Sequence, residues 1–105
     1  MAHGPKGARW ALESTVIFMA KYTVYLLQSL SRPSQFYVGV THDLAARLKK
    51  HNQGSSRSTK PYRPWKVIYQ EKYRNKKEAY KREYYLKKPQ GYLEKKKITE
   101  ENRVK

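Results

Sequence analysis

The sequence predicts an α+β domain, with a three-stranded antiparallel sheet flanked by about three helices. Residues 22–27 and 36–40 are rich in β-branched and aromatic side chains, and a third run of this kind begins at Trp65. Patterns of helical period follow the second and the third run. Because the chain has 105 residues and no internal repeat, we expect one domain with one modest core.

A polar connection, residues 28–35, makes the first two strands a hairpin, since its serines, arginine and proline are typical of a solvated turn. If this hairpin is symmetric about Ser31, Tyr25 and Tyr37 lie directly opposite each other on one face of the sheet. A tyrosine in such a strand is commonly an ordinary sheet residue with its hydroxyl at the rim. The residues alone therefore leave a functional role open.

The first helix is expected to begin at Leu44, because the Asp43 carboxylate can accept the unpaired amide protons of its first turn. It should end near Gly54, a residue type that favours a left-handed position after a helix. Arg47 and His51 border the apolar stripe that faces the sheet. Arg47 either runs along apolar surface with its charged end in water, or points into a groove where an anion binds.

A loop rich in serine and proline, residues 56–64, follows this helix. It is either a plain surface connection or a segment that contacts a phosphodiester backbone, adding affinity without sequence information. The basic side chains that would make these contacts are Arg57, Lys60 and Arg63.

The third strand is expected to run from Trp65 to about Tyr73. Trp65, Val67 and Tyr69 alternate along it, which places Ile68 on the opposite face. Two more helical stretches follow, at residues 76–87 and 91–101. The side chain of Asn75 can cap the first of them, and the second is only weakly amphipathic.

Glu83 lies between the apolar positions Ala79 and Leu86 on the helix over residues 76–87. A carboxylate at the centre of a buried stripe must be paired or bound to a cation. One alternative is a salt bridge, with Arg47 or Arg82 as partner. The other is a ligand for a hard divalent cation such as Mg²⁺, which often uses only one or two carboxylates, water and substrate phosphate.

The composition favours a polyanionic partner. Lysine and arginine number 24 against 8 acidic residues, for a formal charge of +16, and ten tyrosines accompany them. The charge favours nucleic acid or an acidic surface as partner. Basic groups can contact phosphates and aromatic rings can contact bases, so we expect nucleic acid. The absence of cysteine excludes disulfides and thiolate metal sites, and the three histidines show no zinc-ligand pattern.

Residues 1–20 are expected to be a disordered or dispensable extension, followed by a domain over residues 21–99 and a basic tail over residues 100–105. The longest apolar run, residues 16–20, is too short to span a bilayer or to serve as a secretory signal. We therefore expect a cytoplasmic protein without a membrane partner.

Five motifs occur in one order over residues 21–98, and together they resemble the GIY-YIG nuclease superfamily. These are Thr23-Val24-Tyr25, Tyr37-Val38-Gly39, Arg47, His51 and Glu83. The chain is most similar to the small, stand-alone bacterial members. It also resembles the nuclease domain of the excision-repair incision protein and that of GIY-YIG homing endonucleases.

The resemblance implies a metal-dependent phosphodiesterase. In such an enzyme Tyr25 activates the attacking water, and Tyr37 orients water or phosphate. Arg47 neutralises the scissile phosphate, and Glu83 binds a single Mg²⁺ or Mn²⁺ ion. His51 matches a histidine found in some members. These roles agree with the chemistry, because phosphodiester hydrolysis needs an aligned nucleophile and stabilised charge on the phosphate oxygens. A tyrosine base also needs a cationic neighbour such as Arg47 to favour the phenolate.

Three further positions bear on the comparison. Gly39 closes the second motif and is expected to let the backbone turn tightly beside the site. Thr23 stands where the first motif has glycine, and Lys95 stands where several catalytic members have an asparagine.

The leading hypothesis is a small DNA endonuclease or structure-selective nuclease, with DNA repair as its setting, and any specificity would come from DNA shape or from a partner. The alternative is a non-catalytic nucleic-acid-binding module that keeps the fold and its basic surface. A third reading is a basic ribosome-associated protein without an active site. The choice between DNA and RNA and the oligomeric state stay open at this point.

Overall fold

A computed structural model describes residues 20–104, so nearly all of the expected N-terminal extension lies outside the described residues. The elements are β1 (Tyr22–Ser29), β2 (Phe36–Thr41), α2 (Leu44–Gln53), β3 (Trp65–Tyr73), α3 (Lys76–Lys87) and α4 (Tyr92–Asn102), with short 3₁₀ helices η1 (Lys60–Tyr62) and η2 (Pro89–Gly91). Within these residues the strands form one antiparallel sheet in the order β2-β1-β3. The predicted α+β fold is confirmed.

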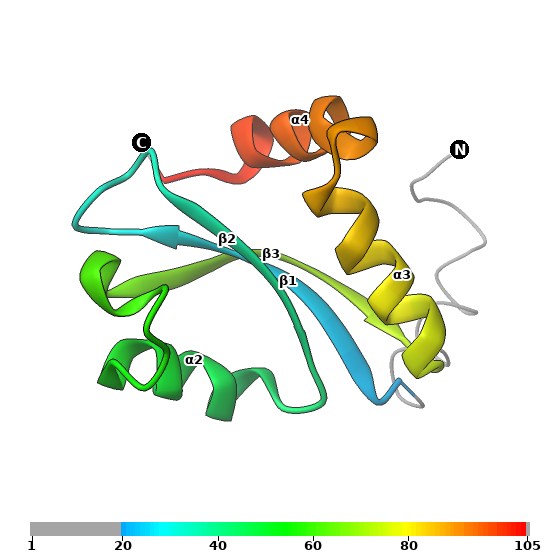
Figure 1. Cartoon of the computed structure of the whole chain (residues 1–105), viewed down its shortest axis with the longest axis horizontal. Helices are drawn as coiled ribbons and strands as arrows, with labels where there is room; N and C mark the ends of the chain where they lie inside the picture. Colours follow the sequence, from blue (N-terminus) through cyan, green and yellow to red (C-terminus); the bar gives the residue numbers. More distant parts are fainter. Residues whose placement is uncertain (1–19, 105) are drawn as a thin grey trace.

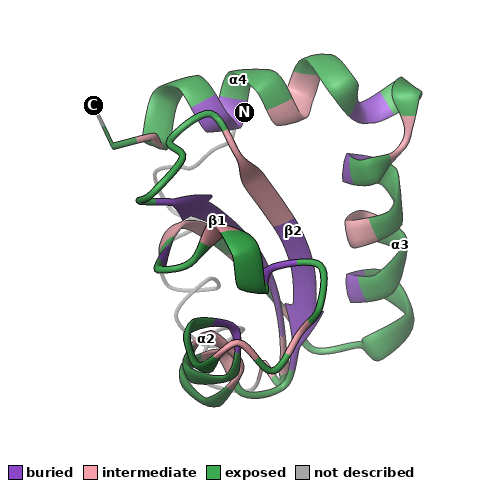
Figure 2. Cartoon of the chain, turned by 60° about the vertical axis from the view of Figure 1, so that its left-hand side comes forward, coloured by how far each residue is buried: buried purple, intermediate pink, exposed green. Residues whose placement is uncertain are grey.

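The sheet separates two groups of packed side chains, because successive residues of a strand point to opposite faces. Helix α2 covers one face, and α3 and α4 cover the other (Figure 1). The α2 side holds Tyr25, Leu27 and Trp65, packed against Leu44 and Leu48. On the other side, the buried residues of α3 face the sheet while most of that helix stays exposed (Figure 2). Tyr25 therefore lies on the α2 side of the central strand.

The register of β1 and β2 differs by two residues from a hairpin symmetric about Ser31. Tyr25 pairs with Gly39, and Tyr37 pairs with Leu27. The expectation that the two tyrosines are directly opposed is therefore wrong. They still share one face, because a two-residue change in pairing preserves the side of the pleat. Their ring centroids are 6.3 Å apart.

A β-bulge interrupts β3 at Ile68. Leu26 pairs with Tyr69 but Leu27 pairs with Val67, so Ile68 is the extra residue. The expected alternation fails at Tyr69, which packs with Ile68 on the side of α3 and α4, whereas Val67 stays on the α2 side. After the bulge, the odd-numbered side chains of β3 therefore face α3 and α4 instead of α2.

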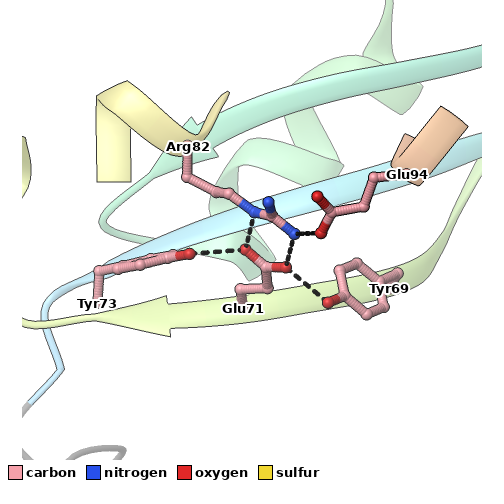
Figure 3. A network of polar contacts seen from close by, with 5 residues as sticks. All are labelled: Tyr69, Glu71, Tyr73, Arg82 and Glu94. Carbon is pink, nitrogen blue, oxygen red and sulfur yellow. Dashed lines mark hydrogen bonds and ion pairs between the residues drawn. The ribbon is translucent and has the colours of Figure 1, made fainter. Parts of the chain in front are cut away.

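This change of face brings Glu71 into a cluster of polar side chains that connects β3 to α3 and α4 (Figure 3). Arg82 donates from Nε and Nη2 to the two Glu71 oxygens, both at 2.8 Å, and Nη2 also donates to Glu94. The hydroxyls of Tyr69 and Tyr73 donate to Glu71 at 2.6 and 2.8 Å. Burial works to raise the pKa of Glu71, but these donors, Arg82 first among them, outweigh it and lower the pKa.

Local capping sets the ends of two helices as the sequence predicts. The Asp43 side chain accepts from the backbone N–H of Ala46 at 3.0 Å, and Asn75 caps α3. Gly54, which follows α2, has a φ of 82° in the left-handed region. Within residues 20–104, no helix has the length and hydropathy that a membrane span requires.

The segment expected as a basic tail begins inside α4, which runs to Asn102. Beyond the helix, the Val104 N–H donates to Gln28 Oε1 at 2.6 Å. The Arg103 guanidinium lies over the Phe36 ring, 5.4 Å from its centroid. The described part of this segment is therefore held against the β1–β2 hairpin.

Candidate active site

An open pocket of ≈ 320 Å³ lies between β2, the C-terminal half of α2 and the loop after it. Its lining residues are Tyr37, Arg47, Lys50, His51, Ser55 and Ser56. Half-buried Arg47 thus faces a concave surface and does not simply extend into water. Three of the predicted site residues share this pocket with a second basic group, Lys50, which suits an anion.

Gly39 leaves room for the ring of Tyr25 across the strand pair. A Cβ atom at position 39 would lie 2.4 Å from Tyr25 Oη and 2.5 Å from its Cζ. Among the glycines in residues 20–104, only Gly54 has a positive φ. The expectation of a tight turn at Gly39 is therefore wrong, because what matters at this position is the absence of a side chain.

Tyr25 starts a chain of buried hydrogen bonds. Its hydroxyl lies 3.1 Å from His51 Nε2, and His51 Nδ1 lies 2.9 Å from Thr59 Oγ1. If the Thr59 hydroxyl donates to the Ser56 carbonyl, 3.4 Å away, it accepts from His51 Nδ1–H. His51 Nε2 is then left to accept from Tyr25. Trp65 Nε1–H donates to the Thr59 carbonyl at 2.9 Å and fixes the loop beneath the ring.

Burial favours the neutral forms of both ring systems. It lowers the pKa of His51, and the nearby positive charge of Arg47 lowers it further. Burial, followed by repulsion from Tyr37, raises the pKa of Tyr25 to about 12, although Arg47 acts in the opposite direction. Arg47 lowers the pKa of Tyr25, as expected, but burial outweighs this effect, so Tyr25 is not a phenolate in the free protein.

Glu83 lies within electrostatic reach of this group from α3. Its half-buried carboxylate contacts Lys87 Nζ at 2.8 Å, so its ion-pair partner is neither Arg47 nor Arg82, which is engaged by Glu71. The Lys87 ammonium also lies 5.6 Å from the ring centroid of Tyr37. Lys87 thus connects Glu83 to a residue of the pocket wall.

The donor set suits a metal ion that is shared with a substrate. Within residues 20–104, no group of three or more His, Cys, Asp and Glu residues could hold a metal by itself. Glu83 offers one carboxylate that already attracts a cation, and Lys87 is an exposed partner in an i,i+4 pair, a weak interaction. Mg²⁺ commonly takes one or two carboxylates and completes its shell with water and substrate phosphate. The residues present fit such an ion.

The basic residues of the loop after α2 are exposed. The side chains of Lys60 and Arg63 lie over Gly54, next to Ser55 of the pocket wall. Arg57 lies in the same loop. Their position at the rim of the pocket is compatible with the predicted contacts to a phosphodiester backbone.

Lys50, Thr59 and Lys87 were not predicted as parts of the site. Lys87 could have been found, because it follows Glu83 by four residues, the spacing of a helical ion pair. Lys95 lies near Lys87, and burial together with that neighbouring charge lowers the pKa of Lys95. Thr59 has no sequence signal, since an irregular loop brings it to His51.

The fold and these residues define a nuclease domain of one class. Residues 21–97 match the family model described as the GIY-YIG catalytic domain, and the chain belongs to this family. The resemblance inferred from the motifs is confirmed.

The relatives are small proteins. The chain is 41% identical to a UPF0213 protein of Staphylococcus epidermidis over 70 residues. This aligned stretch covers 66% of this chain and 83% of the relative. The chain is 40% identical, over the same shares of the two chains, to a UPF0213 protein of Staphylococcus aureus. No solved structure matches the chain.

Proposed function

We propose that this protein is a metal-dependent endonuclease that hydrolyses phosphodiester bonds in DNA. The observation that carries the proposal is the convergence of Tyr37, Arg47 and His51 on one pocket, with Tyr25 hydrogen-bonded to His51. The Glu83 carboxylate, on α3, adds to the raised pKa of Tyr25 and pairs with Lys87, whose ammonium lies 5.6 Å from the ring centroid of Tyr37.

Phosphate binding falls to the basic groups of the pocket. The Arg47 guanidinium can donate two parallel hydrogen bonds to phosphate oxygens, and Lys50 adds a second positive charge. Both charges stabilise the oxygens most strongly as negative charge grows on them in the transition state. The positive charge of Arg47 also acts on the buried Tyr25 side chain, where it favours the phenolate.

Proton transfer then uses Tyr25 and His51 as a pair. As a water oxygen attacks phosphorus, its proton passes to Tyr25 Oη, and the phenolic proton passes to His51 Nε2, which is free to accept it. The bond from phosphorus to the leaving oxygen breaks in the same displacement, and that oxygen takes up a proton from solvent, while His51 later returns its proton to solvent. His51 can serve because it is neutral, and Thr59 holds its other nitrogen in the donor role.

Tyr37 and Glu83 complete the site. The ring of Tyr37 lies 5.0 Å from that of His51, centroid to centroid, and its place in the pocket wall suits it to orient the water. A Mg²⁺ or Mn²⁺ ion held by Glu83 would, when bound, supply positive charge at the phosphate. Lys87 would then leave the carboxylate and become available to a second phosphate oxygen.

We further propose that selectivity is for DNA structure. The exposed groups at the rim of the pocket are Arg57, Lys60 and Arg63. Such side chains contact phosphates and position the duplex but carry no sequence information directly.

A nicking assay on branched and plain duplex DNA, with Mn²⁺ or with EDTA, tests the proposal. Glu83→Ala and Arg47→Ala should abolish cleavage, and Glu83→Ala should retain most DNA binding. Glu100→Ala and Lys49→Ala, which remove exposed groups outside the pocket, serve as matched controls. Cleavage that survives both site substitutions would refute the assigned site.

A non-catalytic nucleic-acid-binding module is the second candidate function. Two observations favour it: Glu83 is already paired with Lys87, and Tyr25 is fully buried. Binding to every substrate with cleavage of none, in Mg²⁺ and in Mn²⁺, would establish this candidate in place of the first.

A further inference from the structure

A row of lysines and tyrosines runs along the exposed side of α3. Lys76, Tyr80 and Tyr84 follow one another at intervals of four on α3, and residues four apart are neighbours on a helix surface. Lys88 is the residue directly after the helix. We call these four residues the α3 tyrosine stripe. Tyr80 is 47% exposed and Tyr84 is 61% exposed. Two large aromatic rings thus stand side by side in solvent.

The stripe plays no part in the core. The core-facing side of α3 consists of Ala79 and Leu86, which are buried against the sheet. The tyrosines of β3 offer a contrast, because Tyr69 and Tyr73 are partly buried and donate to a carboxylate. The hydroxyls of Tyr80 and Tyr84 make no hydrogen bond to any residue in the range 20–104. A contiguous exposed patch of aromatic side chains with no part in the core is typical of a binding surface.

Each ring of the stripe carries its own positive charge. Lys76 Nζ lies 5.8 Å from the ring centroid of Tyr80, and Lys88 Nζ lies 4.4 Å from that of Tyr84. Aromatic rings with ammonium groups beside them are the combination that binds single strands, since rings stack on bases while cations contact phosphates. A duplex cannot use the rings, because its bases are already stacked on one another.

The stripe also lies beside the candidate active site. Tyr80 precedes Glu83 by three residues, so these two side chains are neighbours on the helix surface, and Tyr84 lies one turn beyond Tyr80. A strand whose phosphate enters the pocket therefore has adjacent nucleotides within reach of α3.

We propose that the α3 tyrosine stripe binds the bases of unpaired DNA next to the cleavage site. Tyr80 and Tyr84 stack on successive bases, and Lys76 and Lys88 contact the flanking phosphates. The link to cleavage rests on the proposed function, but the binding itself does not. The stripe would make a branch or flap with an unpaired segment a better ligand than a continuous duplex.

Fluorescence anisotropy in EDTA tests the stripe with the full chain and without catalysis. The ligands are a labelled oligothymidine, an abasic strand of the same length, the corresponding duplex and an oligouridine. Tyr80→Ser combined with Tyr84→Ser should weaken oligothymidine binding about tenfold or more, and change duplex binding less than about twofold. Tyr80→Phe combined with Tyr84→Phe should bind as the parent does, because the rings remain.

Two further arms separate stacking from charge. The abasic strand should bind the parent about as weakly as oligothymidine binds the double serine variant. Lys76→Gln combined with Lys88→Gln should reduce the slope of log affinity against log salt by about 1.4, at about 0.7 for each phosphate contact on a single strand. Tyr92→Ser, which removes a 58% exposed tyrosine at the start of α4, is the control and should have no effect.

An equal loss of affinity for duplex and single strand would overturn the proposal, as would phenylalanine variants that bind as weakly as the serine variants. Tighter binding of oligouridine than of oligothymidine would overturn the assignment to DNA. A parent protein that shows the expected pattern of binding but cuts nothing would refute the proposed hydrolysis and still support the stripe.

Discussion

Gly39→Ala is expected to destabilise the domain through a single added methyl group. The new Cβ atom would lie 2.4, 2.5 and 2.9 Å from three atoms of Tyr25, whereas non-bonded carbon atoms approach only to about 3.5–4.0 Å. Tyr25 cannot turn aside, because it is fully buried and its hydroxyl is hydrogen-bonded to His51. Overpacking of this kind costs about 1–3 kcal/mol. In a domain of this size, each kcal/mol lowers Tm by roughly 4–8 °C.

A double-mutant cycle followed by urea and thermal unfolding identifies the contact responsible. Tyr25→Leu removes the outer ring atoms, so the cost of Gly39→Ala should fall by about 1 kcal/mol or more in its presence. Tyr25→Phe should relieve less, because the ring carbon that would lie 2.5 Å away remains. Gln70→Ala, at the exposed residue of β3 that pairs with Tyr25, is the control.

Two results would refute this reasoning. One is a free energy of unfolding for Gly39→Ala within about 0.5 kcal/mol of the parent, the range of an ordinary surface substitution. The other is additivity of Gly39→Ala and Tyr25→Leu, which would show that the glycine serves some purpose other than space for the phenol.

Three more outcomes follow from the contacts of the site and its support. Lys87→Met should raise the affinity of Glu83 for Mn²⁺ at least about twofold, measured by electron paramagnetic resonance without DNA, because it removes a competing cation. The free energy of unfolding should fall as pH drops below 6.5, because burial lowers the pKa of His51 in the folded protein and the unfolded chain takes up the proton first. His51→Gln should make the free energy of unfolding less dependent on pH in this range. The lowered pKa of Glu71 acts in a separate window, below about pH 4.5. Arg82→Met should cost about 3 kcal/mol in urea unfolding, because it leaves the Glu71 carboxylate without its main partner.

Each of these outcomes has a matched control. Lys81→Met, at another exposed lysine of α3, should leave Mn²⁺ binding unchanged, and Glu83→Gln should remove it. His42→Gln changes an exposed histidine and controls for the loss of an imidazole, while Arg74→Met does the same for an arginine. A pH profile that His51→Gln does not alter, or an Arg82→Met variant as stable as Arg74→Met, would contradict the corresponding prediction.

The sequence by itself determined the elements and their ends, because these depend on interactions within a few residues. Asp43 and Asn75 cap their helices as predicted, and Gly54 takes the left-handed conformation after α2. Helical spacing also placed Glu83 between buried neighbours. The order of the motifs was sufficient to identify the family, since residue types and separations are visible without coordinates.

Only the tertiary structure decided how the strands pair and what the site residues contact. The register that sets Tyr25 against Gly39 and the bulge at Ile68 depend on how the whole sheet packs between its helices, and residues 28–35 carry no signal for either. Thr59 reaches His51 through an irregular loop, which has no periodicity to read. The partner of Glu83 was undecided for a related reason: burial shows that a carboxylate needs a cation, but only three-dimensional contacts show which cation is nearest.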